Sequence, residues 1–387
     1  MKIYLGVSSL SLFVFTCLML SCTKTPVAPT LQVSSSTKHL DRYINAALKR
    51  EGIQPSKMSE DAEFLRRVHL DLTGKIPTPE EVLDFLKDGS SNKRQRKIRE
   101  LLTSNAYLDY WTRLWVNWLI GRREDGDDRR IGLTYWVRDA LTKNIPYNQF
   151  VQELISADGE LRDNGAGNYI LRYERSPVFL TSQTSRLFLG LPMQCAECHD
   201  HKTEIWSQED YYGMAAFFTG IESQRKGNIQ TMDRVGNERR MDNFLITNKA
   251  ENTIWVERLE THVRPHFLDG TAYKGSLLKK REALAQWMTD KSNPYFSQTI
   301  VNRIWKHFMG RAFVEPVDGF GEENPPTHPE LLKWLAKDFV IHGHDLQHLM
   351  RTLLNSETYQ RTSQTNESNK DDQHYYSHAY VKPLSAE

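Results

Sequence analysis

Apolar side chains in the first third of this chain recur at helical spacing. Trp111, Leu114, Trp115, Trp118 and Leu119 follow one another at steps of three, one, three and one residues, which puts them on one face of an α-helix and excludes an alternating strand. A stripe of this kind usually faces a core, so we predict that these tryptophans are buried. A stacking platform for sugar rings is the alternative interpretation.

Two segments have sequence patterns typical of helix N-termini. Thr78-Pro79-Glu80-Glu81 places a hydroxyl at the N-cap, a proline at the first helical position and a glutamate three residues after the cap. Thr327-His328-Pro329-Glu330 repeats this capping box. The residues expected to be buried behind the two boxes are Val82, Leu83, Phe85 and Leu86 in the first helix and Leu331, Leu332, Trp334, Leu335 and Phe339 in the second.

Helices are predicted along most of the chain. Besides the three already described, they are expected near residues 134–143, 147–157, 209–218, 277–290 and 302–309. Residues 224–270 are more polar, and within them 253–259 and 261–268 are predicted to be two short strands. The predicted fold is therefore mainly α and multi-helical, with a helical domain at 38–223, a boundary or small β insert at 224–270, and a second helical domain at 271–387.

The N-terminus has the pattern of an export signal. Lys2 is followed by an almost wholly apolar or small run from Ile3 to Leu20, which ends at Ser21-Cys22. This ending resembles a bacterial lipobox, so we predict a lipoprotein signal peptide at 1–22 and lipidation of Cys22, with 23–37 as a flexible tether to the membrane. Met19 stands where leucine is more usual, and ordinary secretion is the alternative. Both interpretations predict an exported protein of the cell envelope, in the periplasm or at the outer membrane.

Only two cysteines remain in the body of the chain, and they form the run Cys195-Ala-Glu-Cys198-His199. This spacing is typical of covalent c-type haem, in which two thioethers anchor the group and the histidine ligates the iron. Met214 is the favoured ligand for the opposite face of the iron. His307 and His328 are the alternatives for that position.

Two other interpretations of the cysteine motif stay open. Cys195, Cys198 and His201 would form a tetrahedral zinc site if Asp200 or Glu204 completed it. A disulfide between the two cysteines would suit an oxidising compartment. The histidine directly after the second cysteine favours haem.

Charge and composition limit the classes of binding partner that are expected. The chain has 50 basic and 49 acidic residues and a formal charge of +1, so no nucleic-acid partner is expected. The basic run Lys93–Arg99 is interpreted as a solvated helix face. Asp318, Glu322 and Glu323 beside Phe320 are compatible with a glycan site, although the neighbouring glycines and prolines favour a polar loop.

Six longer motifs resemble a known pair of domains. Residues 67–81, 136–150 and 195–218 resemble the exported planctomycete cytochrome-associated domain of unknown function, and residues 302–311, 324–332 and 355–360 resemble the planctomycete-specific domain that follows it. The resemblance implies a redox setting but no agreed reaction. The relatives continue into more helix, so a truncated C-terminal domain is expected, and Ser385 resembles a helix N-cap with no helix behind it.

These observations predict an exported, lipid-anchored c-type haem protein that passes electrons to an unidentified redox partner in the cell envelope. The alternative is an envelope lipoprotein that binds or processes glycans, in which the motif is a structural metal site or a disulfide. A purely structural exported module is a third hypothesis. Whether the protein is an enzyme stays open.

Overall fold

The computed structural model describes residues 34–122, 128–202, 204–232 and 238–383. From residue 33 onward the chain forms one compact unit. The predicted signal peptide, the predicted lipidation site Cys22, most of the predicted tether and Ser385 lie outside the described residues. No helix within the described ranges is long and apolar enough to cross a membrane.

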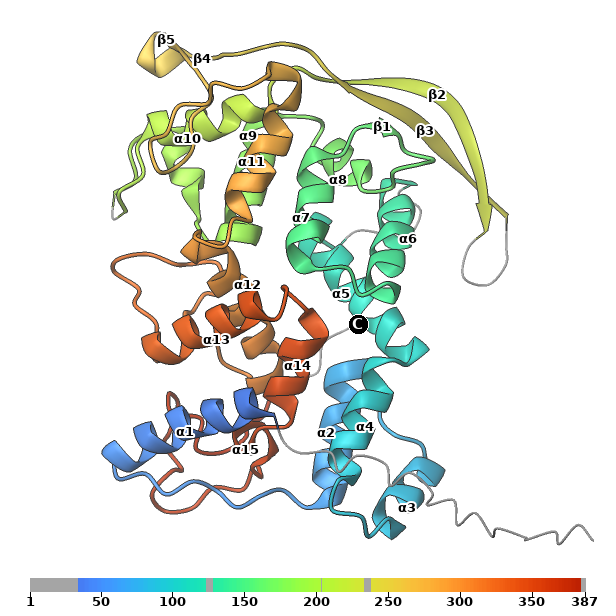
Figure 1. Cartoon of the computed structure of the whole chain (residues 1–387), viewed down its shortest axis with the longest axis vertical. Helices are drawn as coiled ribbons and strands as arrows, with labels where there is room; N and C mark the ends of the chain where they lie inside the picture. Colours follow the sequence, from blue (N-terminus) through green and yellow to red (C-terminus); the bar gives the residue numbers. More distant parts are fainter. Residues whose placement is uncertain (1–33, 123–127, 203, 233–237, 384–387) are drawn as a thin grey trace, which may run out of the picture. The chain divides into compact units, whose positions relative to one another are not determined.

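The fold is mainly α with small sheets, which confirms the predicted class (Figure 1). The helices are α1 (Ser35–Arg50), α2 (Asp61–Thr73), α3 (Pro79–Lys87), α4 (Lys93–Leu102), α5 (Asn105–Ile120), α6 (Asp128–Thr142), α7 (Tyr147–Ser156), α8 (Gly167–Arg172), α9 (Pro177–Thr184), α10 (Gln208–Ala215), α11 (Lys280–Met288), α12 (Pro294–Met309), α13 (Pro329–Ile341), α14 (Leu346–Leu354) and α15 (Glu357–Gln360). The strands are β1 (Gly159–Glu160), β2 (Ile221–Met232), β3 (Glu238–Asn248), β4 (Ile254–Val256) and β5 (Thr261–Val263).

The tryptophan stripe of α5 is part of the core, as predicted. Trp111, Trp115 and Leu119 are buried, and Trp118 is partly buried with its ring edge-on to both of the other tryptophans. The helix begins where the side chain of Ser104 accepts a hydrogen bond from the backbone N–H of Tyr107. Burial of Trp111 and Trp115 removes them as a sugar-stacking platform.

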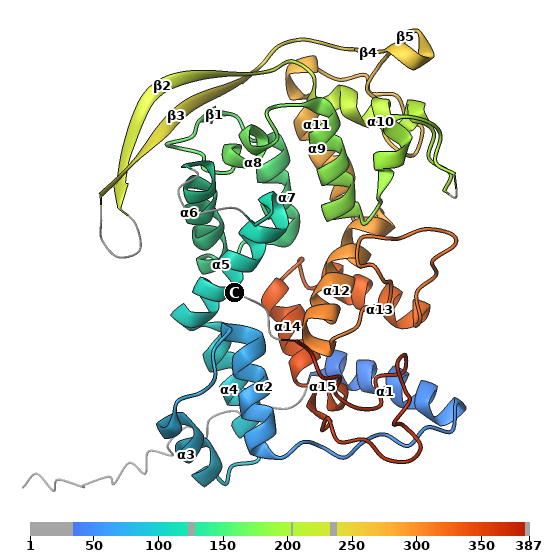
Figure 2. The same ribbon diagram turned by 180° about the vertical axis from the view of Figure 1, so that it is seen from behind.

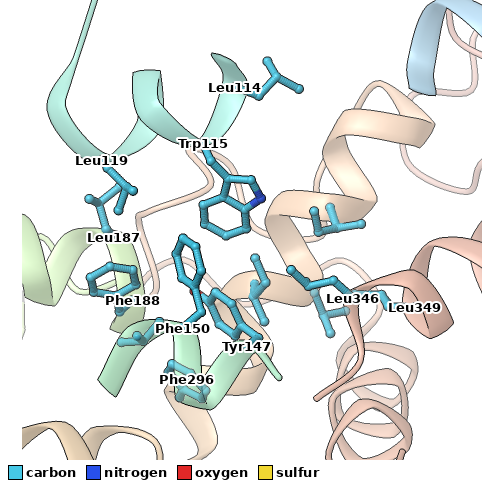
Figure 3. Packing of buried hydrophobic residues seen from close by; sticks show 14 of the residues in the cluster. Leu114, Trp115, Leu119, Tyr147, Phe150, Leu187, Phe188, Phe296, Leu346 and Leu349 are labelled. Carbon is cyan, nitrogen blue, oxygen red and sulfur yellow. The ribbon is translucent and has the colours of Figure 1, made fainter. Parts of the chain in front are cut away.

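The core runs from the first half of the chain into the second. The ring of Tyr147 on α7 stacks on Phe296 of α12, with centroids 4.9 Å apart and planes 17° apart. Figure 3 shows Trp115 and Phe150 beside this pair, with Leu346 and Leu349 of α14 in the same cluster. The two predicted helical domains therefore share one core, and whether either of them folds alone stays a prediction.

Helix α1 packs against the C-terminal helices. The hydroxyl of Thr37 donates to the carbonyl of Thr352, 3.1 Å away, and the Asp41 carboxylate accepts from the backbone N–H groups of Glu357 and Thr358. Burial raises the pKa of Asp41, although these hydrogen bonds act in the opposite direction. Residues 34–37, assigned above to the tether, belong to this folded part, so that boundary of the prediction is wrong.

A long hairpin follows α10 and lies mostly within the predicted boundary or small β insert at 224–270, but its two strands were not predicted. β2 and β3 pair antiparallel from Ile221↔Asn248 to Met232↔Glu238, and β1 pairs with the other edge of β3. Figure 2 shows the two strands curving past β1 and α6. The short pair β4–β5 confirms the two strands expected at 253–259 and 261–268, but both are shorter than predicted. A 3₁₀ turn, Glu257–Leu259, replaces the second half of the first strand, and the second strand ends at Val263.

The two capping boxes have different outcomes. In α3 the hydroxyl of Thr78 accepts from the N–H of Glu81, whose carboxylate accepts from the N–H of Thr78, as predicted. The prediction of a buried apolar stripe in α3 is wrong. Phe85 is buried, but Leu83 and Leu86 are 55% and 47% exposed. Helix α3 packs on α2, where Phe85 lies against Phe64, and this contact covers one narrow strip.

The second box at Thr327 does not form. The N-cap of α13 is His328, without a side-chain cap, because Pro329 takes the first helical position and the cap must precede it. The N–H of Thr327 instead donates to the carbonyl of Phe313. The apolar stripe is nevertheless buried as predicted at Leu331, Leu332, Leu335 and Phe339, with Trp334 partly buried.

The basic run lies on α4, as expected for a solvated helix face. Lys93 and Arg94 form ion pairs with Asp61 of α2, and the apolar side of the helix buries Ile98, Leu101 and Leu102. These ion pairs and the buried apolar side fix α4 against α2.

Helix α13 offers a test of the shared core. Leu335→Asp should lower the free energy of unfolding by about 4 kcal/mol or more, because a carboxylate would replace a fully buried side chain without a partner. Ile341→Asp on the same helix is the matched control, since Ile341 is 68% exposed and its replacement should cost about 0.5 kcal/mol or less. Urea denaturation followed by circular dichroism compares the two. Equal midpoints for Leu335→Asp and the native chain would contradict the packing of α13.

Buried His328 makes stability depend on pH. Burial lowers the pKa of His328 from 6.5 to about 4, an effect that Asp372 opposes and that Arg50 and His374 strengthen. The unfolded chain therefore takes up a proton that the folded chain refuses, and stability contributed by neutral His328 is present above pH 6.5 and falls as the pH drops toward 4. Between pH 7.5 and 5 the loss from this residue should be about 2 kcal/mol.

His328→Gln should remove this part of the pH dependence. The measurement is the unfolding free energy in urea at both pH values, with His262→Gln on exposed β5 as a control for the substitution itself. A pH dependence in His328→Gln as steep as in the native chain would show that other groups cause the acid sensitivity.

Candidate functional site

The cysteine motif lies on the surface, at the end of a short turn. Cys195 belongs to a 3₁₀ turn, Met193–Glu197, and Cys198 follows it directly. Met193 and Ala196 are buried and hold the turn against the core, while both cysteines are exposed with free thiols. The turn therefore directs the two sulfur-bearing side chains outward.

Neighbouring elements fix the path of the motif. The side-chain amide of Gln208 at the start of α10 donates to the carbonyl of Glu197 at 2.9 Å, and the Asp200 carboxylate accepts from the N–H of Gln208 at 2.8 Å. Arg258, which follows β4, donates to the carbonyl of Cys198. The backbone around the cysteines is held by contacts with two neighbouring segments, the start of α10 and Arg258, which favours a preorganised site.

A chain of contacts links the motif to the second half of the protein. A short π-helix, Ser185–Leu189, precedes the turn, and its Arg186 forms an ion pair with Asp318 at 2.8 Å. Gly190 ends this helix with φ of 69°, and a Cβ there would lie 2.5 Å from the ring of Phe320. Glycine is required at this position by both its conformation and its close neighbour.

His199 has the tautomer of a metal ligand. Its Nδ1 lies 2.7 Å from the carbonyl oxygen of Asp200. A carbonyl oxygen can only accept, so Nδ1 carries the proton and Nε2 carries the lone pair. Hydrogen bonding of one ring nitrogen to a backbone carbonyl is the usual arrangement of metal-bound histidine.

His201 has the opposite arrangement. Its Nδ1 accepts from the backbone N–H of Glu204 at 3.1 Å, which puts the proton of a neutral ring on Nε2. The Glu204 carboxylate, a proposed zinc ligand, accepts from the backbone N–H of Glu322 at 3.2 Å. These bonds favour His199 over His201 as a ligand, and the zinc and disulfide hypotheses stay predictions.

The candidates for the opposite iron ligand lie at different depths. Met214 is buried on α10, a helix that packs against the turn carrying Cys195. His307 is partly buried on α12, and its Nε2 donates to the carbonyl of Asp71 at 2.8 Å. His328 is buried among Phe313, Tyr375 and Tyr376. Of the three, Met214 is on the element nearest to the motif, and its role stays a prediction.

Of the carboxylates considered for a glycan site, Asp318 has structural partners. Asp318 pairs with Arg186 and with Arg303 of α12, and Phe320 beside it is buried. An ion-paired carboxylate next to a buried ring is a packing feature, which agrees with the polar-loop interpretation.

An aromatic groove that was not predicted lies beside the loop after the motif. It has a volume of about 740 Å³ and is lined by Trp206, Phe267, Trp287 and Tyr295, among others. Phe267 stacks on Trp287 with centroids 5.4 Å apart, and the Trp287 indole N–H donates to Asp269 at 2.9 Å. These residues come from three separate segments, so no local pattern in the sequence could reveal the groove.

A second cavity, of about 400 Å³, brings together residues from three of the quoted motifs. The Asp71 carboxylate accepts from the hydroxyl of Tyr359 at 2.9 Å and from the ammonium of Lys382 at 2.6 Å. Burial lowers the pKa of His307 and raises that of Tyr359 well above its ordinary value, so both side chains stay neutral near pH 7. Each of these motifs can be recognised in the sequence, but the sequence does not show that they lie together in one cavity.

Comparison with known families gives two matches. The family PSCyt2, described as a protein of unknown function (DUF1549), matches residues 39–223, and PSD1, described as a protein of unknown function (DUF1553), matches residues 280–387. Neither a curated protein nor a solved structure matches this chain. The matches include the cysteine motif and the residues around Asp71, and they confirm the resemblance inferred from the sequence. The chain thus belongs to the proteins in which a PSCyt2 domain is followed by a PSD1 domain.

Proposed function

We propose that Cys195, Cys198 and His199 hold one covalent c-type haem and that the protein has a redox or electron-transfer role. The observation that carries this proposal is the tautomer of His199, whose Nδ1 is bound to the carbonyl of Asp200 and whose Nε2 is left as the basic nitrogen. Two free, exposed thiols stand at the required spacing before it. The residues present fit the attachment chemistry of this group.

Each residue has a separate task in the proposed site. The cysteine thiols would anchor the haem, and His199 would ligate its iron through Nε2. The bound haem would supply one-electron redox chemistry. Gln208 and Arg258, by bonding the carbonyls of Glu197 and Cys198, keep the anchors in place.

Zinc is a weaker explanation of the same motif. It needs His201 as a ligand, and the Nδ1 of that ring already accepts from the N–H of Glu204. Zinc binding through Nε2 of His201 would require the loss of this hydrogen bond and a change of tautomer.

We also propose that the protein is exported and anchored through lipidated Cys22 in the cell envelope. The support is the apolar run that ends at Ser21-Cys22. Helix α1 begins at Ser35, so the sequence from Thr23 to Ser34 would connect the proposed anchor to it.

Glycan binding is the second candidate function, and the aromatic groove favours it. Trp287 and Phe267 present ring surfaces, and Asp269 and Asp290 provide acceptors beside them. Sugars are commonly bound by apolar ring faces with a few polar groups at the rim. The groove is separate from Cys195–His199, so the two functions do not exclude each other.

Covalent attachment can be tested by intact mass. Protein matured in a host with haem-attachment machinery should carry one haem increment that survives denaturation and acid extraction. Cys195→Ala with Cys198→Ala should remove the covalent pigment, and His199→Ala should alter the spin state or impair attachment, because it removes the iron ligand. His201→Ala is the matched control and should keep the haem.

The other outcomes decide between the remaining hypotheses. A colourless protein with one zinc that is lost in His201→Ala would replace haem by zinc. A protein without metal that gains two thiols on reduction would identify a disulfide. Absence of the haem increment in native protein from such a host overturns the proposal.

Lipid anchoring can be tested at Cys22. In cells fed a labelled fatty acid, the native chain should take up label, and Cys22→Ser should take up none, since the thiol is the acceptor. Cys17→Ser is the control for losing a cysteine from the same segment. Equal labelling of native chain and Cys22→Ser, or none in the native chain, would leave ordinary secretion as the explanation.

A further inference from the structure

A carboxylate and two imidazoles meet where α13 turns into α14. Asp338 lies on α13, His342 follows its last residue, and His348 lies on α14. One ligand atom from each of the three lies within 4.8 Å of the others, and no other group of three such residues is this close in the described part of the chain. None of the motifs analysed above includes this group.

We infer that Asp338, His342 and His348 form a binding site for a divalent transition-metal ion, with zinc as the best match. Two imidazole nitrogens and one carboxylate oxygen are a ligand set that first-row transition metals prefer. The inference does not depend on the cysteine motif and goes beyond the proposed haem function.

The three ligand atoms are close enough to converge on one metal ion once the side chains turn. The Nε2 of His348 lies 2.9 Å from an oxygen of Asp338, and the two rings are stacked with centroids 3.7 Å apart and planes 15° apart. Ligands in a tetrahedral zinc site are separated by about 3.3 Å, given bonds of about 2.0–2.1 Å. The Asp338 carboxylate can only accept, so Nε2 of His348 carries a proton in this arrangement. Binding an ion therefore requires that the His348 ring release this proton and that the two imidazoles rotate out of their stack.

Neighbouring groups orient these ligands. The hydroxyl of Ser36 on α1 donates to the Asp338 carboxylate at 2.8 Å. The Nδ1 of His342 donates to the backbone carbonyl of Asp338 at 2.8 Å. The lone pair of the neutral ring is therefore on Nε2, and not on the nitrogen that lies 3.4 Å from the Asp338 carboxylate. Outer hydrogen bonds of this kind fix the ring tautomer and raise affinity.

The site is sheltered on one side and open on the other. The side chains of Asp338 and His348 are 12% and 17% exposed, while that of His342 is 42% exposed. An ion can enter beside His342 and keep water in its remaining positions.

The backbone between the ligands brings them together. Gly343 and His344 both adopt left-handed conformations, with φ of 71° and 57°. This turn reverses the chain over a few residues and allows His342 and His348 to stack. A bound ion would join α13 to α14 and, through Ser36, would strengthen their contact with α1.

Zinc titration of the full mature chain tests the inference. We would use a Cys195→Ser, Cys198→Ser background, so that neither the thiols nor a haem contributes and the result does not depend on the haem proposal. Isothermal titration calorimetry after chelator treatment should show one zinc per chain. His342→Asn and His348→Asn should each weaken zinc binding at least tenfold, and zinc should raise the melting temperature of the background chain but not of these variants.

His39→Asn is the matched control. His39 lies on α1 and stacks on Trp334 of α13 at 4.5 Å, so it belongs to the same surface but not to the ligand set, and its replacement should leave zinc affinity unchanged. If His348→Asn fails to fold, exposed His342→Asn still decides. No zinc binding by the background chain, or equal affinity in His342→Asn, would overturn the site and leave Asp338 as the partner of an ordinary ion pair.

Discussion

The stack of Tyr147 on Phe296 is the contact on which the rest of the structure depends, because it holds α7 against α12. From α12, Arg303 reaches the carbonyl of Leu187 and the carboxylate of Asp318. Asp318 in turn binds Arg186, in the π-helix just before the cysteine turn. The surface position of the cysteines is therefore set by an apolar core formed by both halves of the chain, although the motif is purely local in sequence.

Periodicity predicted the helices well where one face is buried by several neighbours. The stripes of α5 and α13 are such cases, since packing from both halves covers them. It failed in α3, where only Phe85 reaches a neighbour, because a local pattern cannot tell how wide the facing surface is. It also missed β2, whose residues Glu222, Gln224, Arg225 and Lys226 are exposed. A strand held mainly by backbone pairing leaves no apolar alternation to detect.

The candidate site, like the fold, could be predicted only in part from the sequence. The Cys195–His199 spacing is visible in the sequence because its residues are consecutive, yet the proton position that separates His199 from His201 depends on backbone contacts that only the fold supplies. Asp71 meets Tyr359 across 288 residues, and the aromatic groove is assembled from three segments. Such clusters form between residues that are far apart in the sequence, so they cannot be predicted from residue spacing.

The β2–β3 hairpin has a consequence for how this protein behaves at high concentration. β2 is an outer strand, and its unpaired backbone groups would accept a strand from another molecule. The pairing shifts between Arg225 and Gly227, so Lys226 sits in a bulge on that open edge. A bulge twists the edge and a lysine places charge on it, and both oppose further strand addition. Lys226 and the bulge around it therefore oppose aggregation through the free edge of β2.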